Sequence, residues 1–417
     1  MKLLIQFYSH LKNHSLKFLP FFSFVILLSS CAPSKRFTEY KETSIKDYKN
    51  EIRVLLGDSP TEIKTGSDVY LISQNEKLAI IKSGNKISIE PLYQDLLIKL
   101  GSKNFNGKDF NLEPVSDSLI KVNNKRYRGK IKLMNVDGKI KQINQLSLED
   151  YLKGVMTKEM PVGKGNENFE AFKAFAIAAR TYALNKIFNS RTYYDLLPDV
   201  NDQVYGGVDA EHPISNKAVD ETKGLILTFK DEPAIIFYHS TCAGFTENAK
   251  NVFTKDEIEY LKSIKDGETP YCSISPNFNW KEVIPEKTLI KRLFDAKLLK
   301  SENYSIEKFN IKSRFSSGRI NELEIILKSV DGLSSVSIFG NQIRSIIKNQ
   351  SGNGILKSNN FIIELTPEKN VEIIGKGYGH GVGLCQWGAI AQSRSGKSYQ
   401  EILSHYFPGT EIKKLND

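Results

Sequence analysis

The stretch from residue 148 to residue 159 carries an apolar stripe that is typical of an α-helix, and the last position on that stripe is a glutamate. Leu148, Leu152 and Val155 recur at the spacing that places side chains along one line of a helix, given about 100° of rotation per residue. The next position on the same line is Glu159. The stretch therefore predicts a helix whose last turn directs a carboxyl group toward the core.

The sequence leaves two interpretations of the end of this helix open. Ser147 followed by Asp150 forms a capping box at its start. Pro161 ends it near Met160, because a residue before proline avoids the α region. Either the last turn emerges into water, or Glu159 lies in an apolar wall. In the second case burial raises the pKa of its carboxyl group, and the protonated form is available for acid catalysis.

Composition and charge narrow the class of protein. The 417 residues are 40% hydrophobic and 25% charged, which is enough to bury the core of one large domain or two. The net charge of +10 comes from Lys and Arg scattered along the chain, and no basic run interleaved with aromatic residues predicts a nucleic-acid groove. A diffuse positive surface suits anionic polymers such as cell-wall glycans, and lipid headgroups. We therefore expect no nucleic-acid partner.

The N-terminus predicts export. Lys2, Lys12 and Lys17 precede an apolar run over residues 18–28 that is too short to span a bilayer comfortably. Small residues then lead into Cys31, a pattern that resembles a bacterial lipobox in which this cysteine is lipidated. We expect a membrane-anchored lipoprotein in the periplasm or cell envelope. The alternative is an ordinary signal peptide or an uncleaved anchor with an incidental cysteine.

The order of helix and strand signals predicts an α+β fold. Short alternating apolar runs make residues 51–146 β-rich, and a second strong helix follows over residues 168–188. Strand signals return at residues 225–229 and 234–239. We divide the chain into a lipoprotein signal peptide (1–30), a polar tether (31–50), a β-rich N-terminal part (51–146) and a core (147–412) that contains an insertion or subdomain (281–368).

Three polar or glycine-rich stretches are candidates for a site. Residues 199–212 lack periodicity and form a loop, which is either part of a site or a turn-rich connector. Residues 238–249 follow a predicted strand with a dense set of hydrogen-bonding groups. Residues 375–389 alternate glycines around His380, which lets the backbone approach a ligand or another strand while presenting one imidazole, and we favour a site role for it. No phosphate-loop register fits this stretch, so nucleotide binding is not expected.

Three cysteines remain once Cys31 carries lipid, and an odd number is awkward for an exported domain. One interpretation is a disulfide between Cys242 and Cys272, with Cys385 buried and inert. The other is a structural zinc bound by His239, Cys242, Cys272 and Cys385, because three thiolates and an imidazole make a closed tetrahedral site. Both remain open, and we expect no cofactor to be required for chemistry.

Five separated stretches together resemble the SpoIID/LytB family of bacterial cell-wall proteins. They are 151-YLKGVMTKEMP-161, 170-EAFKAFAIAARTYAL-184, 202-DQVYGG-207, 238-YHSTCAG-244 and 377-GYGHGVGLCQWGA-389. Ala243 departs from the family, which more often has a second glycine in its His-Ser-Thr-Cys-Gly-Gly motif. The resemblance implies the SpoIID-like mixed fold, with the Glu-Met-Pro motif on a central helix and a glycine-rich motif near the C-terminus.

The same resemblance implies a lytic transglycosylase that cuts peptidoglycan strands whose stem peptides have been removed, leaving 1,6-anhydromuramyl ends. Glu159, in the Glu-Met-Pro motif, is then the catalytic acid. The family's other role is to enhance a cell-wall amidase without catalysis, which is the alternative function. The implied partners are peptidoglycan strands, the membrane that holds the lipid anchor, and such an amidase. The candidates for binding the sugars are Asp202, Gln203, Tyr205, His239, Ser240, His380 and Gln386, while Lys173 and Arg180 are expected to be structural.

Overall fold

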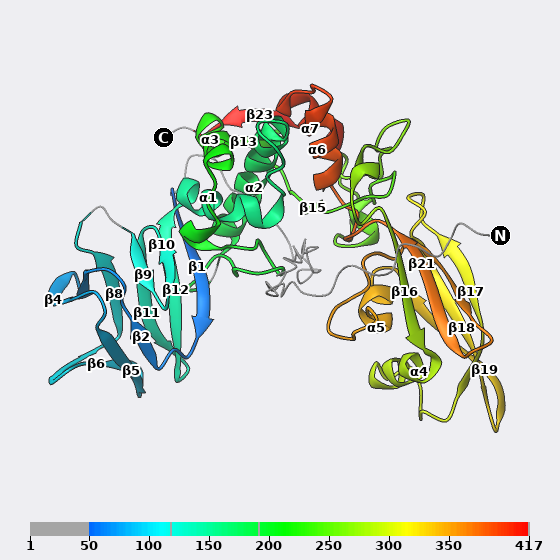
Figure 1. Ribbon diagram of the computed structural model, residues 1–417, viewed down its shortest axis with the longest axis horizontal. Helices are drawn as coiled ribbons and strands as arrows, with labels where there is room; N and C mark the ends of the chain where they lie inside the picture. The colour runs from blue at the N-terminus through cyan, green and yellow to red at the C-terminus, as the bar shows by residue number, and fades with distance from the viewer. Residues whose placement is uncertain (1–49, 117–118, 191, 416–417) are drawn as a thin grey trace, which may run out of the picture.

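The computed structural model describes residues 50–116, 119–190 and 192–415, and the predicted signal peptide, Cys31 and the predicted tether up to residue 49 lie outside these residues. Three parts follow one another along an arch, with N-terminal strands at one end, helices at the centre and a second group of strands at the other end (Figure 1). Within the described residues, no helix is long and apolar enough to cross a membrane. The mixed α+β fold predicted from the sequence is confirmed.

The N-terminal part consists mainly of two antiparallel sheets. Ile131 and Leu133 are buried while their strand neighbours Lys130 and Lys132 are only partly covered, as the alternation of a half-buried strand requires. The first sheet has the order β1 (Glu51–Asp58), β12 (Lys139–Ser147), β11 (Lys130–Val136), β8 (Asp109–Pro114), β3 (Val69–Ser73) and β4 (Glu76–Ile81). The second has the order β2 (Glu62–Lys64), β5 (Lys86–Leu92), β6 (Asp95–Leu100) and β7 (Lys103–Gly107), and a hairpin joins β9 (Ile120–Val122) to β10 (Lys125–Tyr127).

The central part packs helices against the end of the first sheet. Strand β12 runs directly into α1 (Leu148–Glu159), where the Ser147 hydroxyl caps the helix by accepting from the backbone N–H of Asp150 at 3.1 Å. The other helices are α2 (Phe169–Asn189), η2 (Gly207–Ala210), α3 (Pro213–Glu221), η3 (Ala249–Asn251), η4 (Tyr271–Ile274), α6 (Gln386–Arg394) and α7 (Tyr399–Tyr406). One hydrophobic core runs from the N-terminal strands through these helices.

Two short sheets complete the centre. Strands β14 (Glu232–Pro233), β13 (Leu225–Phe229) and β23 (Glu411–Lys414) pair antiparallel, and β15 (Tyr238–His239) pairs in parallel with β22 (Leu384–Cys385). The strand predicted over residues 234–239 is wrong except for its last two residues. Pairing with β13 stops after Ala234, which donates its backbone N–H to the carbonyl oxygen of Leu227 at 2.9 Å, because Ile235 donates to the Tyr260 hydroxyl at 2.7 Å.

Residues 279–376 form a C-terminal unit with a hydrophobic core of its own, which includes Trp280, Leu289, Leu323 and Ile373. It contains two antiparallel three-stranded sheets and two helices. Its elements are β16 (Asn279–Pro285), α4 (Glu286–Asp295), β17 (Ser305–Arg314), β18 (Ile320–Ser329), β19 (Gly332–Phe339), α5 (Gln342–Ile347), β20 (Phe361–Leu365) and β21 (Asn370–Lys376). The chain then returns from β21 to the centre.

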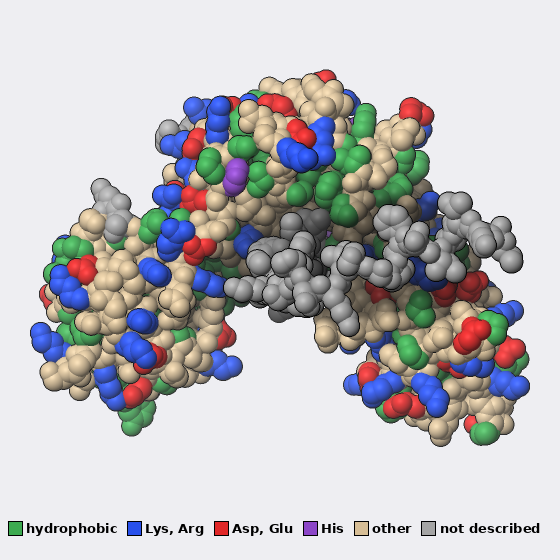
Figure 2. Space-filling view, in the orientation of Figure 1, with side chains coloured by type: hydrophobic (Ala, Val, Ile, Leu, Met, Phe, Trp, Pro, Cys, Tyr) green, Lys and Arg blue, Asp and Glu red, His purple; other side chains and the backbone are tan. Residues whose placement is uncertain are grey.

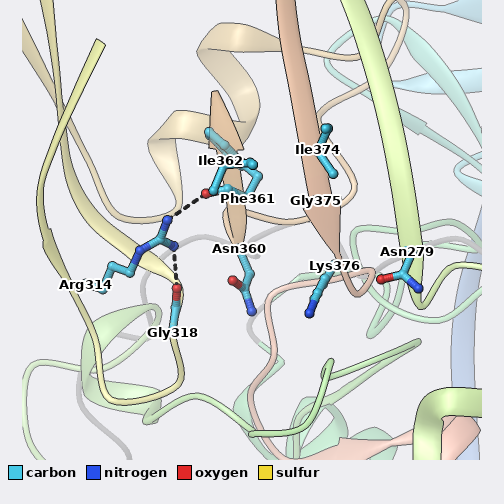
Figure 3. Close-up of a pocket in the computed structure, with 9 residues that line it drawn as sticks. All are labelled: Asn279, Arg314, Gly318, Asn360, Phe361, Ile362, Ile374, Gly375 and Lys376. Atoms are coloured by element: carbon cyan, nitrogen blue, oxygen red, sulfur yellow. Dashed lines mark hydrogen bonds between the residues drawn. The ribbon is translucent and has the colours of Figure 1, made fainter. Parts of the chain in front are cut away.

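A pocket lies on this C-terminal unit, and Figure 3 shows the nine residues that line it. Arg314 forms one side, donating to the carbonyl oxygens of Gly318 at 2.6 Å and Phe361 at 2.7 Å. Lys376 extends from the opposite side. Gly375 and Lys376 belong to the glycine-rich stretch 375–389, but none of the nine residues is among those predicted to bind sugar or metal. Over the whole visible face, basic and acidic side chains are interspersed (Figure 2), as expected for a diffuse positive charge.

Candidate active site around Glu159

Glu159 ends α1 with its side chain inside the protein. The residue is only 3% exposed, and Leu152, Val155 and Met156 on the same helix are fully buried. The helix ends as predicted, because Met160 adopts an extended conformation before Pro161. The interpretation in which the last turn emerges into water is therefore wrong, and the interpretation of a carboxyl group held in an apolar wall is confirmed.

Two hydrogen bonds hold the Glu159 carboxyl group. Oε1 accepts from the backbone N–H of Val204 at 2.8 Å, and Oε2 accepts from Nε2 of Gln386 at 3.4 Å. None of the ion pairs in the described part of the chain includes Glu159. Burial raises the pKa of Glu159 to about 7, and the hydrogen bonds from Val204 and Gln386 lower it in part. Near neutral pH this one group can therefore both donate and accept a proton.

The buried carboxyl group should make stability depend on pH. A folded-state pKa of about 7 against an ordinary value of 4.5 means that the folded protein binds more protons than the unfolded chain between these values. The stabilisation is present in full below pH 4.5 and is lost as the pH rises to about 7. Across this range the parent should lose about 3 kcal/mol of unfolding free energy relative to E159Q, because the glutamine amide does not titrate. Urea unfolding of both proteins at several pH values measures it, and an unchanged difference would contradict the raised pKa.

The loop at residues 199–206 presents the backbone N–H of Val204 to Glu159, and Asp202 holds this loop in place. The Asp202 carboxylate pairs with the Nζ atom of Lys186 at 2.7 Å and accepts from the Tyr182 hydroxyl at 3.0 Å. Its second oxygen accepts from the backbone N–H of Leu197 at 2.8 Å. These contacts give Asp202 a structural role in the free protein, whereas the sequence predicted that it binds sugar.

Tyr205 fastens the same loop to α1. Its hydroxyl donates to Oδ1 of Asn144 at 2.8 Å, and its ring packs so closely on Gly154 that a Cβ atom there would lie 2.5 Å from the ring. The backbone N–H of Gly206 also donates to the carbonyl of Gly154, at 3.0 Å. The glycine in the middle of α1 is thus required for the approach of the loop that reaches Glu159.

Gln203 differs from its neighbours because part of its side chain has no partner. Its Oε1 atom accepts from the Tyr151 hydroxyl at 3.1 Å, but its Nε2 atom is buried and meets no acceptor among the described residues. A buried donor without an acceptor costs about 1–3 kcal/mol, so such a group in a native site calls for an explanation. A ligand carbonyl group would satisfy it.

His239, Ser240 and His380 are all buried at the junction of β15 with the glycine-rich motif. His239 places Nδ1 3.1 Å from the carbonyl oxygen of Val382, and His380 accepts from the backbone N–H of Val382 at 3.0 Å. Burial lowers the pKa of His239 to about 3 and also lowers that of His380, so both imidazoles are neutral. The hydrogen bonds described for Glu159 come from Val204 and Gln386 and not from these histidines. The structure therefore brings Gln386 to the carboxyl group but gives the two histidines other neighbours.

The glycine-rich motif packs its backbone against the segment after β14. Such a close approach to another part of the chain is one of the two uses predicted for its alternating glycines. Gly379 and Gly383 have φ values of 112° and 72°. A Cβ atom would lie 2.7 Å from the His239 Cβ atom at the first position, and would overlap the Phe237 carbonyl oxygen at the second. Ala243, opposite this motif, has a φ of 66°, a conformation that glycine adopts without strain, in keeping with the second glycine that the family resemblance implies there.

The three cysteines described by the structure meet in the core. Cys242, Cys272 and Cys385 are buried free thiols, and with Asp266 they form a group whose ligand atoms all lie within 4.8 Å of one another. His239 is not in this group, although the zinc interpretation included it. Asp266 was missed because it lies in a turn before Gly267, six residues from Cys272, and that spacing carries no known metal-binding signature.

Comparison with known proteins places this site in a family. A family model described as stage II sporulation protein matches residues 136–229. An uncharacterized protein of Brachyspira hyodysenteriae is 30% identical over 71% of this chain and 74% of its own length. The stage II sporulation protein D of Bacillus amyloliquefaciens is 29% identical over 66% of this chain and 76% of its length. The chain belongs to the SpoIID family. The resemblance noted in five motifs is thereby confirmed.

Two further matches describe other aspects of this SpoIID-family protein. The amidase enhancer of Bacillus subtilis is 30% identical over 63% of this chain, but the aligned region is only 40% of that relative. A second family model, described as a domain of unknown function, matches residues 273–383. This match spans the C-terminal unit with its own core and extends into the glycine-rich motif as far as Gly383.

Proposed function

We propose that this protein is a peptidoglycan lytic transglycosylase in which Glu159 is the single acid and base. Membership in the SpoIID family and the similarity to an amidase enhancer support a cell-wall-related role. The observation that carries the finer proposal is the environment of Glu159, a buried carboxyl group with a pKa of about 7 and no described ion-pair partner. That environment suits a group that must donate a proton near neutral pH.

The proposed reaction needs one carboxyl group for both of its steps. Protonated Glu159 donates its proton to the glycosidic oxygen while the bond from that oxygen to C1 of the muramyl sugar breaks. The resulting carboxylate then takes the proton from the C6 hydroxyl of the same sugar as O6 forms a bond to C1. The products are a 1,6-anhydromuramyl end and a free C4 hydroxyl group, and Glu159 is protonated again.

The contacts of Asp202 favour this reaction over hydrolysis. A glycoside hydrolase of the usual kind needs a second carboxylate that activates water or attacks the sugar. Asp202 is the other acidic residue of the predicted site, and its carboxylate is occupied by Lys186, Tyr182 and Leu197. An intramolecular attack by the C6 hydroxyl requires no such group. In this proposal the free Nε2 atom of Gln203 donates to an acetamido carbonyl of the glycan.

Mass spectrometry of glycan fragments tests this function against the alternative. The chain without its predicted signal peptide is incubated with intact and with amidase-treated peptidoglycan. We expect anhydromuramyl ends, and more of them from the amidase-treated strands, because the family resemblance implies a preference for strands without stem peptides. Glycan binding without anhydro ends would contradict the proposal.

The second candidate function is enhancement of a cell-wall amidase, which the similarity to the amidase enhancer favours. In that case the protein binds glycan and raises the rate at which a partner amidase releases stem peptides, without cutting strands itself. Assaying peptide release by an amidase with and without this protein separates the two functions, since only the enzyme leaves anhydro ends when the amidase is absent.

The rate of glycan cleavage should fall on the alkaline side of neutrality. The reaction starts from protonated Glu159, whose pKa is raised to about 7 by burial. As the pH rises above that value the protonated fraction falls, and we expect kcat/KM to fall about tenfold per pH unit. A pH profile of anhydro-product formation measures this limb. The range from pH 6 to pH 9 extends from roughly one pH unit below that pKa to two above it. A rate that stays constant over this range would contradict Glu159 as the acid.

A further inference from the structure

Three thiols and a carboxyl group from distant segments converge inside the central part of the protein. Cys242 follows β15, Cys272 lies in η4, and Cys385 ends β22. Asp266 belongs to the loop before η4. All four side chains are buried, and one ligand atom from each lies within 4.8 Å of the others. The Sγ atoms of Cys242 and Cys272 are 3.4 Å apart, which compares with an edge of about 3.8 Å in a tetrahedron whose zinc–sulfur distances are about 2.3 Å.

These four groups are all acids, and they need a cation if they are to be charged in the core. None of the ion pairs in the described part of the chain involves Asp266. Its carboxyl oxygens accept from the Tyr406 hydroxyl at 2.6 Å and from the backbone N–H of Cys272 at 2.9 Å. Buried charges are costly unless they are paired or bind a metal. Three thiolates and one carboxylate are a donor set that suits tetrahedral zinc.

The surroundings of the cluster resemble the outer shell of a zinc site. The backbone N–H of Cys242 points at the sulfur of Cys385 at 3.3 Å, a contact that favours a thiolate. The buried guanidinium of Arg319 donates to the carbonyl oxygen of Cys242 at 3.1 Å. Its positive charge lies beside a cluster that would carry a net negative charge with zinc bound. Tyr406, in turn, orients the Asp266 carboxylate.

We propose that Cys242, Asp266, Cys272 and Cys385 bind one Zn²⁺ ion. With four protein ligands the coordination shell is closed, so the metal is structural and takes no part in proton transfer. The sequence suggested His239 as the fourth ligand, and in this proposal Asp266 takes that place. The ion would tie the loop after β15, the segment around η4 and the start of α6 together.

This position gives the metal a consequence for the candidate active site. Cys385 directly precedes Gln386, the first residue of α6, and Gln386 donates to Glu159. At Gly388, two residues further on, a Cβ atom would overlap the Tyr406 hydroxyl and lie 2.7 Å from Asp266. The start of α6 is thus built closely around the cluster. The zinc would fix Gln386 beside the carboxyl group, and this part of the inference rests on the proposed function.

Metal analysis of the purified protein tests the site. The chain without its predicted signal peptide is produced in zinc-containing medium, purified without chelator or reductant, and analysed by inductively coupled plasma mass spectrometry. We expect about one zinc per chain, the stoichiometry of a single closed site. C385S and D266N should each lose most of the metal, whereas H239Q should keep it. Loss of zinc in H239Q with retention in D266N would overturn the assignment of the fourth ligand.

Two measurements on the unmutated protein guard against variants that fail to fold. Cobalt-substituted protein should show a sulfur-to-cobalt charge-transfer band in the near-ultraviolet and the intense visible bands of tetrahedral cobalt. Mass analysis under denaturing, non-reducing conditions should give the mass of a chain with all its described thiols reduced. A folded protein that lacks metal and has lost two hydrogens would contain a disulfide between two of these three cysteines instead, and would overturn the proposal. Neither readout depends on glycan cleavage, so they remain decisive even if the protein is not an enzyme.

Discussion

Replacing Glu159 by glutamine is expected to lower the rate of anhydromuramyl product formation by roughly 10²–10⁴-fold, the usual contribution of a general acid or base. Glutamine has nearly the same shape, and its carbonyl oxygen can still accept from the backbone N–H of Val204. The amide cannot donate a proton to the glycosidic oxygen at neutral pH. The loss should therefore appear in kcat, while glycan binding by E159Q stays close to that of the parent.

The control for E159Q is the same chemical change at a glutamate on the surface. The side chain of Glu268 is 94% exposed and, within the described part of the chain, forms an ion pair with Lys265 at the surface, so E268Q should cleave glycan at the parental rate. Both variants are compared by mass spectrometry of products from amidase-treated peptidoglycan. If E159Q retained the parental rate, the assigned mechanism would be lost. If the parent and E159Q were equally inactive but both stimulated an amidase, the enhancer function would take its place.

The sequence predicted the helix of Glu159 well because the information is local. The apolar stripe, the Ser147 cap and the proline after Met160 each act within a few residues, and they determine where α1 begins and ends. The same periodicity offered burial of Glu159 as one of two interpretations, and the structure decided between them. The raised pKa then required only that no cation lie nearby, which the described ion pairs bear out.

The roles of the other site residues depended on contacts that are remote in sequence. Asp202 meets Tyr182 across 20 positions, and Gln386 meets Glu159 across 227 positions. The donor from the loop to Glu159 is the backbone of Val204, which has no side-chain signature. Asp266 joins the cysteines only because η4 folds against α6. Motif order could name the family, but it could not distinguish residues that hold the site from residues that are free to touch a ligand.

Replacing Arg180 by alanine is expected to lower the free energy of unfolding of the central core by about 3–5 kcal/mol, as when one partner of a buried ion pair is removed. The Arg180 side chain is fully buried, and it binds both carboxyl oxygens of Glu149, at 2.8 and 2.7 Å. It also donates to the carbonyl oxygen of Leu225 at 2.9 Å. R180A leaves the Glu149 carboxylate, at 12% side-chain exposure, without its counter-charge.

A matched variant shows whether burial is the cause. Arg126 binds Asp209 at 2.7 Å, but the two side chains are 50% and 40% exposed, so R126A should cost no more than about 1 kcal/mol. Urea unfolding followed by Trp387 fluorescence in a W280F background reports on the central core, since Trp280 belongs to the core of the C-terminal unit. Adding E149Q to R180A should recover part of the loss, because no unpaired charge then remains at the start of α1. Equal losses of unfolding free energy in R180A and R126A would mean that water reaches Arg180. The Arg180–Glu149 ion pair would then not fix α1 against α2, although α1 is the helix that carries Glu159.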